Sequence, residues 1–362
     1  MNAYIIAQLP IILGFVLLLV SGSVWPRITP RLNALTQLIT LLALGSSALL
    51  TAVFLMPGEE FFAGAVRVTL IGKALSVVVL LLALLAASTS ADYLTKVRAR
   101  PTEFRIMLMA QAFGLFHLPL AGDLTTAFIA FELVSIPSYI LAGFNFRDAR
   151  AGEAGLKYLI LGAVSSALFL LGLTFLYGAT GEIQFAAIQG AIGGFILDGE
   201  SGLAPLLLVK AGLALILTAL LFKVAAAPFH AWLPDVYQGA NLASLAAIAA
   251  PAKIALFGFL AVMLWGPFAY LHETWKPLLL IAAALSAVLG NLQALSQRGI
   301  KRMLAYSSTV NAGFILLALF LDSAGPFLLY LAAYGVTVVG MVAVLMALGT
   351  RTADVEEHAD LR

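Results

Sequence analysis

Cysteine is absent from this chain of 362 residues, and histidine occurs only four times. Without cysteine there are no disulfides, no thiolate-bound iron–sulfur clusters and no cysteine nucleophile. The histidines lie singly at His117, His230, His272 and His358, so their spacing indicates no metal site. We therefore predict neither a metal nor a redox cofactor in this chain. Any redox chemistry coupled to it belongs to another chain.

Charge is also scarce in this sequence. Only 10% of the residues are charged, against about 25% in ordinary soluble domains, and 62% are hydrophobic. The formal net charge of +2 is too small to indicate a nucleic-acid partner. Repeated apolar runs of at least about 18 residues predict an all-α, polytopic membrane protein.

The apolar runs divide the chain into about eleven candidate transmembrane helices within a single transmembrane domain over residues 1–362. The first run lacks a basic leader and a small-residue cleavage site, so we expect a retained helix rather than a signal peptide. The segment 182–203 is apolar, short and rich in glycine, and we expect it at the outer interface. The expected helices cover residues 3–25, 33–55, 68–90, 104–121, 124–144, 155–178, 204–228, 242–265, 277–296, 302–321 and 325–349.

Basic residues follow the odd-numbered helices, and acidic residues dominate the intervening loops. The seventh helix is the exception, because the loop after it carries Asp235 and no lysine. By the positive-inside rule, this alternation places the N-terminus outside and the C-terminus in the cytoplasm. The cations on which the orientation depends are Arg27, Arg31, Lys96, Arg98, Arg100, Arg105, Arg147, Arg150, Arg298, Lys301, Arg302, Arg351 and Arg362.

A lysine next to a helix breaker interrupts the seventh run. Lys223 lies in an apolar run long enough to cross a bilayer, and Pro228 follows it. An ammonium at the centre of a membrane helix costs about 2.5 to 3.5 kcal/mol, so such groups usually face a wet cavity or a partner. Pro228 disrupts the helix one turn earlier, so we expect a kink or break directly after Lys223. Alternatively, Lys223 snorkels to the nearer surface and Pro228 merely ends the helix.

Glu132, Lys223 and Lys253 are ionisable residues well inside apolar runs, and each has a proline close by. Burial disfavours the charge of each group, whereas an ion pair restores it, so moving the partners apart changes their affinity for protons. This arrangement predicts a relay that loads and releases a proton through small helix movements. The alternative is a static buried ion pair that holds the bundle together.

Three further residues have two readings each. Lys157, at the start of the sixth helix, either snorkels or points inward toward Glu132. His117 is either a hydrogen-bonded core residue or a proton carrier. His230 either anchors the interface or, like Pro228, takes part in the relay or its gating.

Several sequence blocks, taken in chain order, resemble the antiporter-like membrane subunits of respiratory complex I, most closely the chain N family. A subunit of the multisubunit cation/proton antiporters shares part of this pattern. The blocks are Phe-Glu-Leu-Val-Ser-Ile-Pro-Ser-Tyr at 131–139, Leu-Lys-Tyr-Leu-Ile-Leu-Gly-Ala at 156–163, Leu-Tyr-Gly-Ala-Thr-Gly at 176–181, Phe-Lys-Val-Ala-Ala-Ala-Pro-Phe-His-Ala-Trp-Leu-Pro-Asp-Val-Tyr-Gln-Gly-Ala at 222–240, Gly-Asn-Leu-Gln-Ala-Leu-Ser-Gln at 290–297 and Lys-Arg-Met-Leu-Ala-Tyr-Ser-Ser at 301–308.

The resemblance implies an antiporter-like fold with a broken seventh helix and two inverted five-helix repeats. Residues 104–265 correspond to the first antiporter-like five-helix unit, and residues 277–349 correspond to an incomplete second unit. By their positions in the blocks, Glu132, Lys223 and Lys253 match the family's proton half-channel. Lys157 matches a modulator of that half-channel.

Three departures from the family pattern bear on this expectation. Asn241-Leu242-Ala243 stands where Pro-Thr-Pro is usual, which alters the entry to the eighth helix. Asn311 stands where a histidine is common, which weakens a relay through the tenth helix. The chain stops at Arg362, whereas family members generally continue through further helices, including a second broken one. We expect either a fragment or truncated product, or an exit route supplied by other means.

From the resemblance we expect a proton-translocating, non-redox membrane subunit of a NADH:quinone oxidoreductase, a translocase of the respiratory chain. NADH, flavin, iron–sulfur clusters and quinone would be held by partner subunits. The expected partners are the other membrane subunits of complex I and the lipid bilayer, with no nucleic acid, and the expected location is a bacterial inner (plasma) membrane. The alternatives are a subunit of a multisubunit cation/proton antiporter, which needs no redox partner, and a purely structural membrane scaffold.

Overall fold

The computed structural model describes residues 3–24, 29–97, 99–145 and 147–349. These residues form a helical bundle with one short antiparallel hairpin, β1 (Glu60–Phe61) and β2 (Val66–Arg67), which confirms the all-α fold. The helices are α1 (Ala3–Val24), α2 (Pro30–Phe54), α3 (Leu70–Lys96), α4 (Pro101–His117), α5 (Leu124–Ala142), α6 (Ala149–Thr180), α7 (Phe185–Leu197), α8 (Leu203–Lys223), α9 (Leu233–Gly239), α10 (Leu242–Ala247), α11 (Lys253–Trp265), α12 (His272–Leu295), α13 (Ile300–Phe320) and α14 (Ala324–Leu348).

Ten of the described helices are long and apolar enough to cross a membrane, so the chain is an integral membrane protein. The span Leu242–Trp265 is one of them, because α10 continues into α11 through a π-helical turn at Ile248–Ala252. The sequence predicts about eleven spans, and the remaining one is α4. Its 17 residues lie at the lower limit of the length that crosses hydrocarbon.

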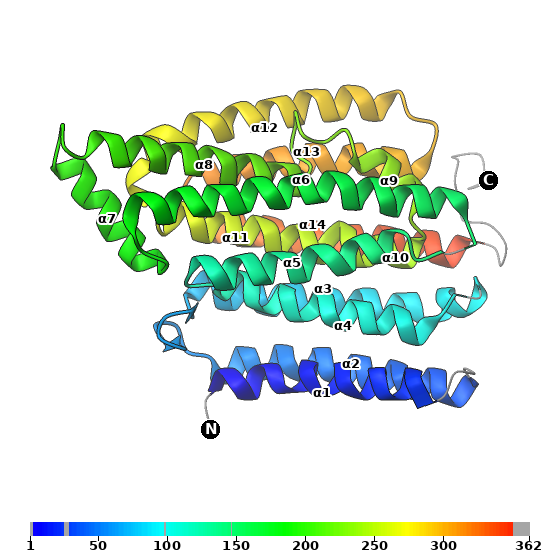
Figure 1. Cartoon of the computed structure of the whole chain (residues 1–362). Helices are drawn as coiled ribbons and strands as arrows, with labels where there is room; N and C mark the ends of the chain where they lie inside the picture. The colour runs from blue at the N-terminus through cyan, green and yellow to red at the C-terminus, as the bar shows by residue number, and fades with distance from the viewer. Residues whose placement is uncertain (1–2, 25–28, 98, 146, 350–362) are drawn as a thin grey trace.

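The long helices lie side by side along a common direction, with α1 and α2 at one edge and α12 at the opposite edge (Figure 1). The span Leu242–Trp265 is the most enclosed of those described. In an apolar stretch of 18 residues within this span, 94% of the residues are buried. The corresponding share is 28% in Ala3–Val24 and in Ala269–Leu295. Lys253 therefore lies on the helix that the rest of the bundle surrounds.

The glycine-rich segment 182–203 contains α7, a shorter helix that lies at the end of the bundle where α8 begins (Figure 1). Its 13 residues are too few to cross a bilayer as a helix. The predicted position at the outer interface stays a prediction.

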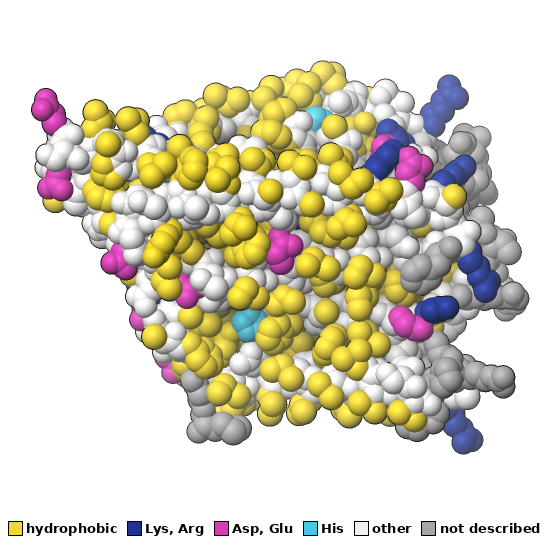
Figure 2. Space-filling view, viewed as in Figure 1, with side chains coloured by type: hydrophobic (Ala, Val, Ile, Leu, Met, Phe, Trp, Pro, Cys, Tyr) yellow, Lys and Arg dark blue, Asp and Glu magenta, His cyan; other side chains and the backbone are white. Residues whose placement is uncertain are grey.

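Charged side chains are divided between the two ends of the bundle. Lysine and arginine gather at the end where α6 begins, and acidic side chains predominate at the other end (Figure 2). This distribution agrees with the alternation of charge along the loops. Among the cations used for orientation, Arg27, Arg98, Arg351 and Arg362 lie outside the described residues.

Arg105, which the sequence analysis counts among the loop cations, does not lie in a loop. It lies inside α4 and is only 1% exposed. Its guanidinium donates to neutral oxygens of α2: Nε to Gln37 Oε1 at 2.8 Å, and Nη1 to Thr36 Oγ1 at 2.7 Å and Asn33 Oδ1 at 2.8 Å. Arginine presents five donors in a rigid fork, and α2 supplies acceptors for them, so this cation joins two helices instead of marking a loop.

The predicted break directly after Lys223 is confirmed. α8 ends at Lys223 and no helix follows until α9 begins at Leu233, so the helix expected over 204–228 is five residues too long. Ala225 adopts a φ of 55°, which lies outside the right-handed helical region, and Pro228 has no backbone N–H to donate.

Side chains from elsewhere satisfy backbone groups that this break exposes. Trp232 Nε1 donates to Phe222 O at 3.1 Å, and Ala227 N donates to Ser286 Oγ of α12 at 2.8 Å. An unpaired backbone group in hydrocarbon costs several kcal/mol, so these bonds allow the chain to stay unwound at this depth.

An ion-pair cluster holds α9, the helix that follows the break. Asp235 accepts from Lys157 Nζ of α6 at 2.9 Å and from Arg302 Nη1 of α13 at 3.0 Å. Lys157 also pairs with Glu153 at 2.7 Å. The hydrogen bond from Lys157 is the largest cause that holds the pKa of Asp235 below its ordinary value. The cluster joins α6, α9 and α13 at the basic end of the bundle.

The contact between α6 and α8 predicts a stability difference between two glycines of α6. A Cβ at Gly172 would lie 2.8 Å from Gly212 O, whereas a Cβ at Gly152 would meet nothing within 4 Å. We expect Gly172→Ala to cost about 1 to 3 kcal/mol through overpacking and to lower the thermal midpoint by a few degrees in detergent. The matched control Gly152→Ala should not lower it, because alanine favours the helix. Equal thermal midpoints for the two variants would contradict this, because they would show that α6 and α8 can move apart to accommodate the added methyl group.

The Asp235 cluster predicts a pH dependence. Because the folded pKa of Asp235 is lowered, its contribution to stability is present above the ordinary aspartate pKa of about 4 and is lost as the pH falls through the folded value. We expect Asp235→Asn to unfold at a lower temperature than the parent protein at pH 7. The gap should close below about pH 4. Melting curves of both proteins from pH 3 to pH 8 measure this, and a gap independent of pH would contradict it.

Candidate functional site

Lys223 ends α8 inside the bundle, with 2% of its surface exposed, so it does not snorkel to the surface. Its Nζ donates to Ser135 Oγ at 2.9 Å and to the hydroxyl of Tyr139, both on α5. The ammonium also lies 4.9 Å from the ring centroid of Phe131 and 4.6 Å from that of Tyr139. Hydroxyls and aromatic faces thus surround a cation that forms no ion pair within the described part of the chain.

The spacing along α5 explains this arrangement. Phe131, Ser135 and Tyr139 are four residues apart, so they share the helix face that meets Lys223. Gly162 of α6 leaves room for the Tyr139 ring, because a Cβ at that position would overlap it. The site is therefore built by three helices, α5, α6 and α8.

Glu132 lies on α5 directly after Phe131. It is half-buried, and its Oε1 has no hydrogen-bond partner among the described residues. The static Glu132–Lys223 ion pair considered from the sequence is therefore not formed in the described chain.

Lys253 follows the π-helical turn that contains Pro251, and 3% of its surface is exposed. Its Nζ donates to Ser308 Oγ of α13 at 2.5 Å and lies 5.9 Å from the ring centroid of Tyr237. Ser308 Oγ is in turn 2.7 Å from Tyr334 Oη of α14. As at Lys223, hydroxyls and an aromatic ring meet the buried ammonium.

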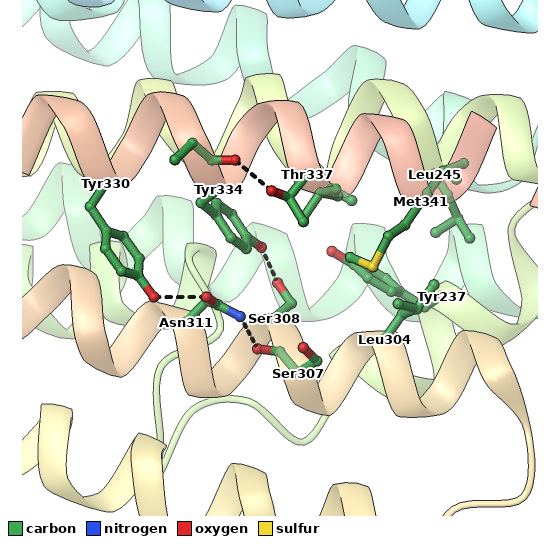
Figure 3. A pocket seen from close by; sticks show the side chains of 14 residues that line it. Tyr237, Leu245, Leu304, Ser307, Ser308, Asn311, Tyr330, Tyr334, Thr337 and Met341 are labelled. Atoms are coloured by element: carbon green, nitrogen blue, oxygen red, sulfur yellow. Dashed lines mark hydrogen bonds between the residues drawn. The ribbon is translucent and has the colours of Figure 1, made fainter. Parts of the chain in front are cut away.

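A cavity of about 390 Å³ adjoins Ser308 between α13 and α14 (Figure 3). Tyr330 and Tyr334 point from α14 toward α13, and the hydroxyl of Tyr330 donates to Asn311 Oδ1 at 2.9 Å. The hydroxyl of Tyr237 is buried without a partner in the described chain. The cavity therefore offers polar groups to water or to a proton beside Lys253.

His230 lies in the unwound segment after Lys223, and Pro228 lies two residues before it. His230 is 7% exposed, and its Nε2 is 2.7 Å from Gln293 Oε1 of α12, whereas Pro228 is exposed. The ring thus packs inside the bundle instead of anchoring an exposed interface.

The structure separates Lys157 and His117 from the two buried lysines. Lys157 pairs with Glu153 and Asp235 and does not meet Glu132. Phe131, the neighbour of Glu132 on α5, stacks on Phe169 of α6 with ring centroids 4.6 Å apart, so Glu132 lies at about the height of Phe169 in the bundle. Lys157 precedes Phe169 by twelve residues, which is about 18 Å along α6. His117 bonds to Phe113 O at 2.6 Å and to Gln8 Oε1 at 3.1 Å.

The sequence reasoning missed the hydroxyl partners of the lysines. Ser135 and Tyr139 stand in the first family block, four and eight residues after Phe131, and this spacing places all three on one helix face. Ser308 stands in the last block, but nothing in the sequence pairs it with Lys253. Asn241, which stands where the family pattern has proline, accepts from Ser244 N at 2.8 Å and so caps α10.

Chemically, the site can hold a proton on either lysine and pass it through hydroxyls. Serine and tyrosine hydroxyls both donate and accept, so a hydrogen-bonded chain of them can conduct a proton without a net change of its members. Within the described residues, no three histidine, aspartate or glutamate side chains gather to hold a metal ion.

Known proteins resemble this chain in sequence and in structure. Residues 121–362 match the family described as NADH:quinone oxidoreductase/Mrp antiporter, transmembrane. The NADH-quinone oxidoreductase subunit N of Hirschia baltica is 36% identical over 336 residues, which cover 91% of this chain and 68% of that protein.

Two solved structures share the fold. A chain in respiratory complex I from Thermus thermophilus matches with a TM-score of 0.76 at 30% identity, over 97% of this chain and 72% of that one. A chain of the Mrp complex from Dietzia sp. matches with a TM-score of 0.79 at 18% identity, over 96% of this chain and 64% of that one, and it supports the fold alone. The predicted antiporter-like fold and the resemblance to chain N are confirmed. The chain therefore belongs to the transmembrane family of NADH:quinone oxidoreductases and Mrp antiporters.

Proposed function

We propose that this chain is a proton-translocating membrane subunit of a NADH:quinone oxidoreductase. The observation that carries the proposal is Lys223, a buried ammonium placed at a helix break and held only by hydroxyls and aromatic faces in the described chain. A lysine held in this way gains or loses its proton when neighbouring groups move slightly, because no fixed counter-ion stabilises the charged ammonium.

Glu132 supplies the variable part of this environment. Its carboxylate acts on Lys223 through space without touching it, and a negative charge there favours the protonated ammonium. A shift of Glu132, or neutralisation by a neighbouring subunit, removes that support and favours release of the proton. The helix break allows Lys223 to move, because the backbone after it is not tied into a helix.

Lys253 is the second proton-holding group of the proposal. It lies on the central span, and Ser308, Tyr334 and the adjoining cavity offer the proton a path between α13 and α14. Asn311 does not titrate, so it can only orient Tyr330. Lys157 acts from the basic end by holding Asp235, and His117 takes the role of a core residue bonded to Gln8.

The wider context follows from the relatives. We infer that residues 104–265 form the first five-helix unit and that residues 277–349 form part of a second. NADH oxidation and quinone reduction take place in partner subunits, which hold the flavin, iron–sulfur clusters and quinone. The chain lies in a bacterial plasma membrane with its basic end, where α6 begins, in the cytoplasm.

A subunit of a multisubunit cation/proton antiporter is the second candidate. The matching family includes Mrp antiporters, and a chain of the Dietzia Mrp complex shares the fold. Such a subunit would use the same buried charges and would need no electron flow.

The proposal predicts that the buried lysines are required for pumping. We expect Lys223→Ala and Lys253→Ala each to lower proton pumping at least about tenfold in the assembled enzyme, because each removes a group that holds the proton. The measurement is proton uptake into inside-out vesicles driven by NADH. Lys210→Ala is the matched control on α8, because Lys210 lies thirteen residues earlier, about 20 Å along the helix from Lys223. Pumping that survives Lys223→Ala would favour the purely structural scaffold.

The two candidate functions predict different assemblies. As a subunit of the oxidoreductase, this chain should co-migrate with a large NADH-oxidising band on native electrophoresis after mild extraction. As an antiporter subunit, it should migrate without that activity and support sodium-dependent proton exchange when no electrons flow. Sodium exchange in the absence of NADH would overturn the respiratory proposal.

A further inference from the structure

Gln293 of α12 contacts His230 at the break after Lys223. The ring nitrogen Nε2 lies 2.7 Å from the amide oxygen of Gln293, and the other nitrogen, Nδ1, is buried without a hydrogen-bond partner in the described chain. The unwound segment lies against α12 here, since Ala227 N also donates to Ser286 of that helix (Figure 1).

The chemistry of the two side chains fixes where the proton of the neutral ring sits. An amide oxygen only accepts, so Nε2 must carry the hydrogen, and Nδ1 is then left with a free lone pair. A buried acceptor without a partner costs about 1 to 3 kcal/mol, and such groups in native proteins call for a reason. A lone pair open to an incoming proton is such a reason.

We infer that Gln293 is a positioning residue that holds His230 as a proton acceptor at the break. An arriving proton binds Nδ1 and gives an imidazolium that carries both N–H groups. When Nδ1 releases the proton, the ring returns to the same tautomer, because Gln293 keeps the hydrogen on Nε2. The ring therefore need not turn over between protons. This inference rests on the proposed proton-translocating function and adds a proton acceptor to it.

The groups around His230 in the described chain support this role. Tyr306 of α13 meets the ring with centroids 6.4 Å apart and an interplanar angle of 68°, and it is the titratable group in ring contact. Lys223 lies seven residues earlier on the other side of the break. Arg302 donates to Gln297, Gln238 and Asp235 instead. The group at Nε2 is thus a neutral amide and not a carboxylate.

The test replaces the amide with a carboxylate in the complete enzyme. In Gln293→Glu, a negative charge beside Nε2 favours the imidazolium. Nδ1 then stays protonated up to a higher pH and cannot accept another proton. We expect the acidic limb of the profile of protons pumped per NADH against pH to move upward by about one pH unit. Proteoliposomes containing the assembled enzyme give the profile.

Two further variants make the result specific. Gln297→Glu, one turn further along the chain, adds the same charge beside Arg302 and should leave the limb where it is. Gln293→Leu removes the acceptor from Nε2 without adding charge; it should lower the number of protons pumped per NADH severalfold with no upward move of the limb. It also provides the test if the glutamate variant fails to assemble.

The outcomes separate this inference from the proposed function. An unshifted limb in Gln293→Glu, equal shifts in Gln293→Glu and Gln297→Glu, or an unchanged pumping ratio in Gln293→Leu overturns the role of Gln293. Lys223→Ala measured in the same preparation tests the function itself: if that variant still pumps, the function fails whatever Gln293 does.

Discussion

The structure depends on one constraint: a charged or polar group inside hydrocarbon must find its partners within the protein. Lys223 and Lys253 meet this constraint without carboxylates, through hydroxyls and aromatic rings supplied by α5 and α13. The same constraint fixes the break after α8, where a tryptophan and a serine satisfy the freed backbone. The same few side chains thus stabilise the fold and surround the two buried lysines.

The constraint also explains why α12 and α13 pack so closely on the unwound segment. A break inside a membrane is tolerated only where protein covers it. Ser286 and Gln293 of α12 cover one side, while Tyr158 of α6 stacks on Trp232 with ring centroids 4.7 Å apart. Asp235 then ties the following helix to α6 and α13. The break in the seventh span is therefore enclosed by neighbouring helices.

Much of the fold is readable from the sequence, because a bilayer demands long apolar runs and a proline reliably interrupts them. The spans, the break after Lys223 and the family all follow from such local signals. The sequence does not show which side chains on neighbouring helices point toward each other. From the sequence alone, Lys157 can equally turn toward Glu132 or away from it; the Phe131–Phe169 stack shows that the two residues lie at different levels of the bundle. Arg105 reads as a loop cation because its acceptors on α2 are about seventy residues distant in the chain.

The site residues, like the fold, are only partly predictable from the sequence. Lys223, Lys253 and Glu132 stand out because a charge within an apolar run is rare, whereas the hydroxyls that hold the lysines look like ordinary serines and tyrosines. Pairing Lys253 with Ser308 requires the packing of α11 on α13, which no spacing rule supplies. The roles of these residues stay proposals, but their positions are now defined.

The enclosure of the span Leu242–Trp265 has a consequence for how the protein responds to its membrane. Helices at the edge, such as α1 and α12, leave most of their apolar residues uncovered by the rest of the chain, so they can tilt when bilayer thickness changes. The span that carries Lys253 is almost entirely covered by other helices. A change in bilayer thickness therefore reaches Lys253 only through the helices that surround its span.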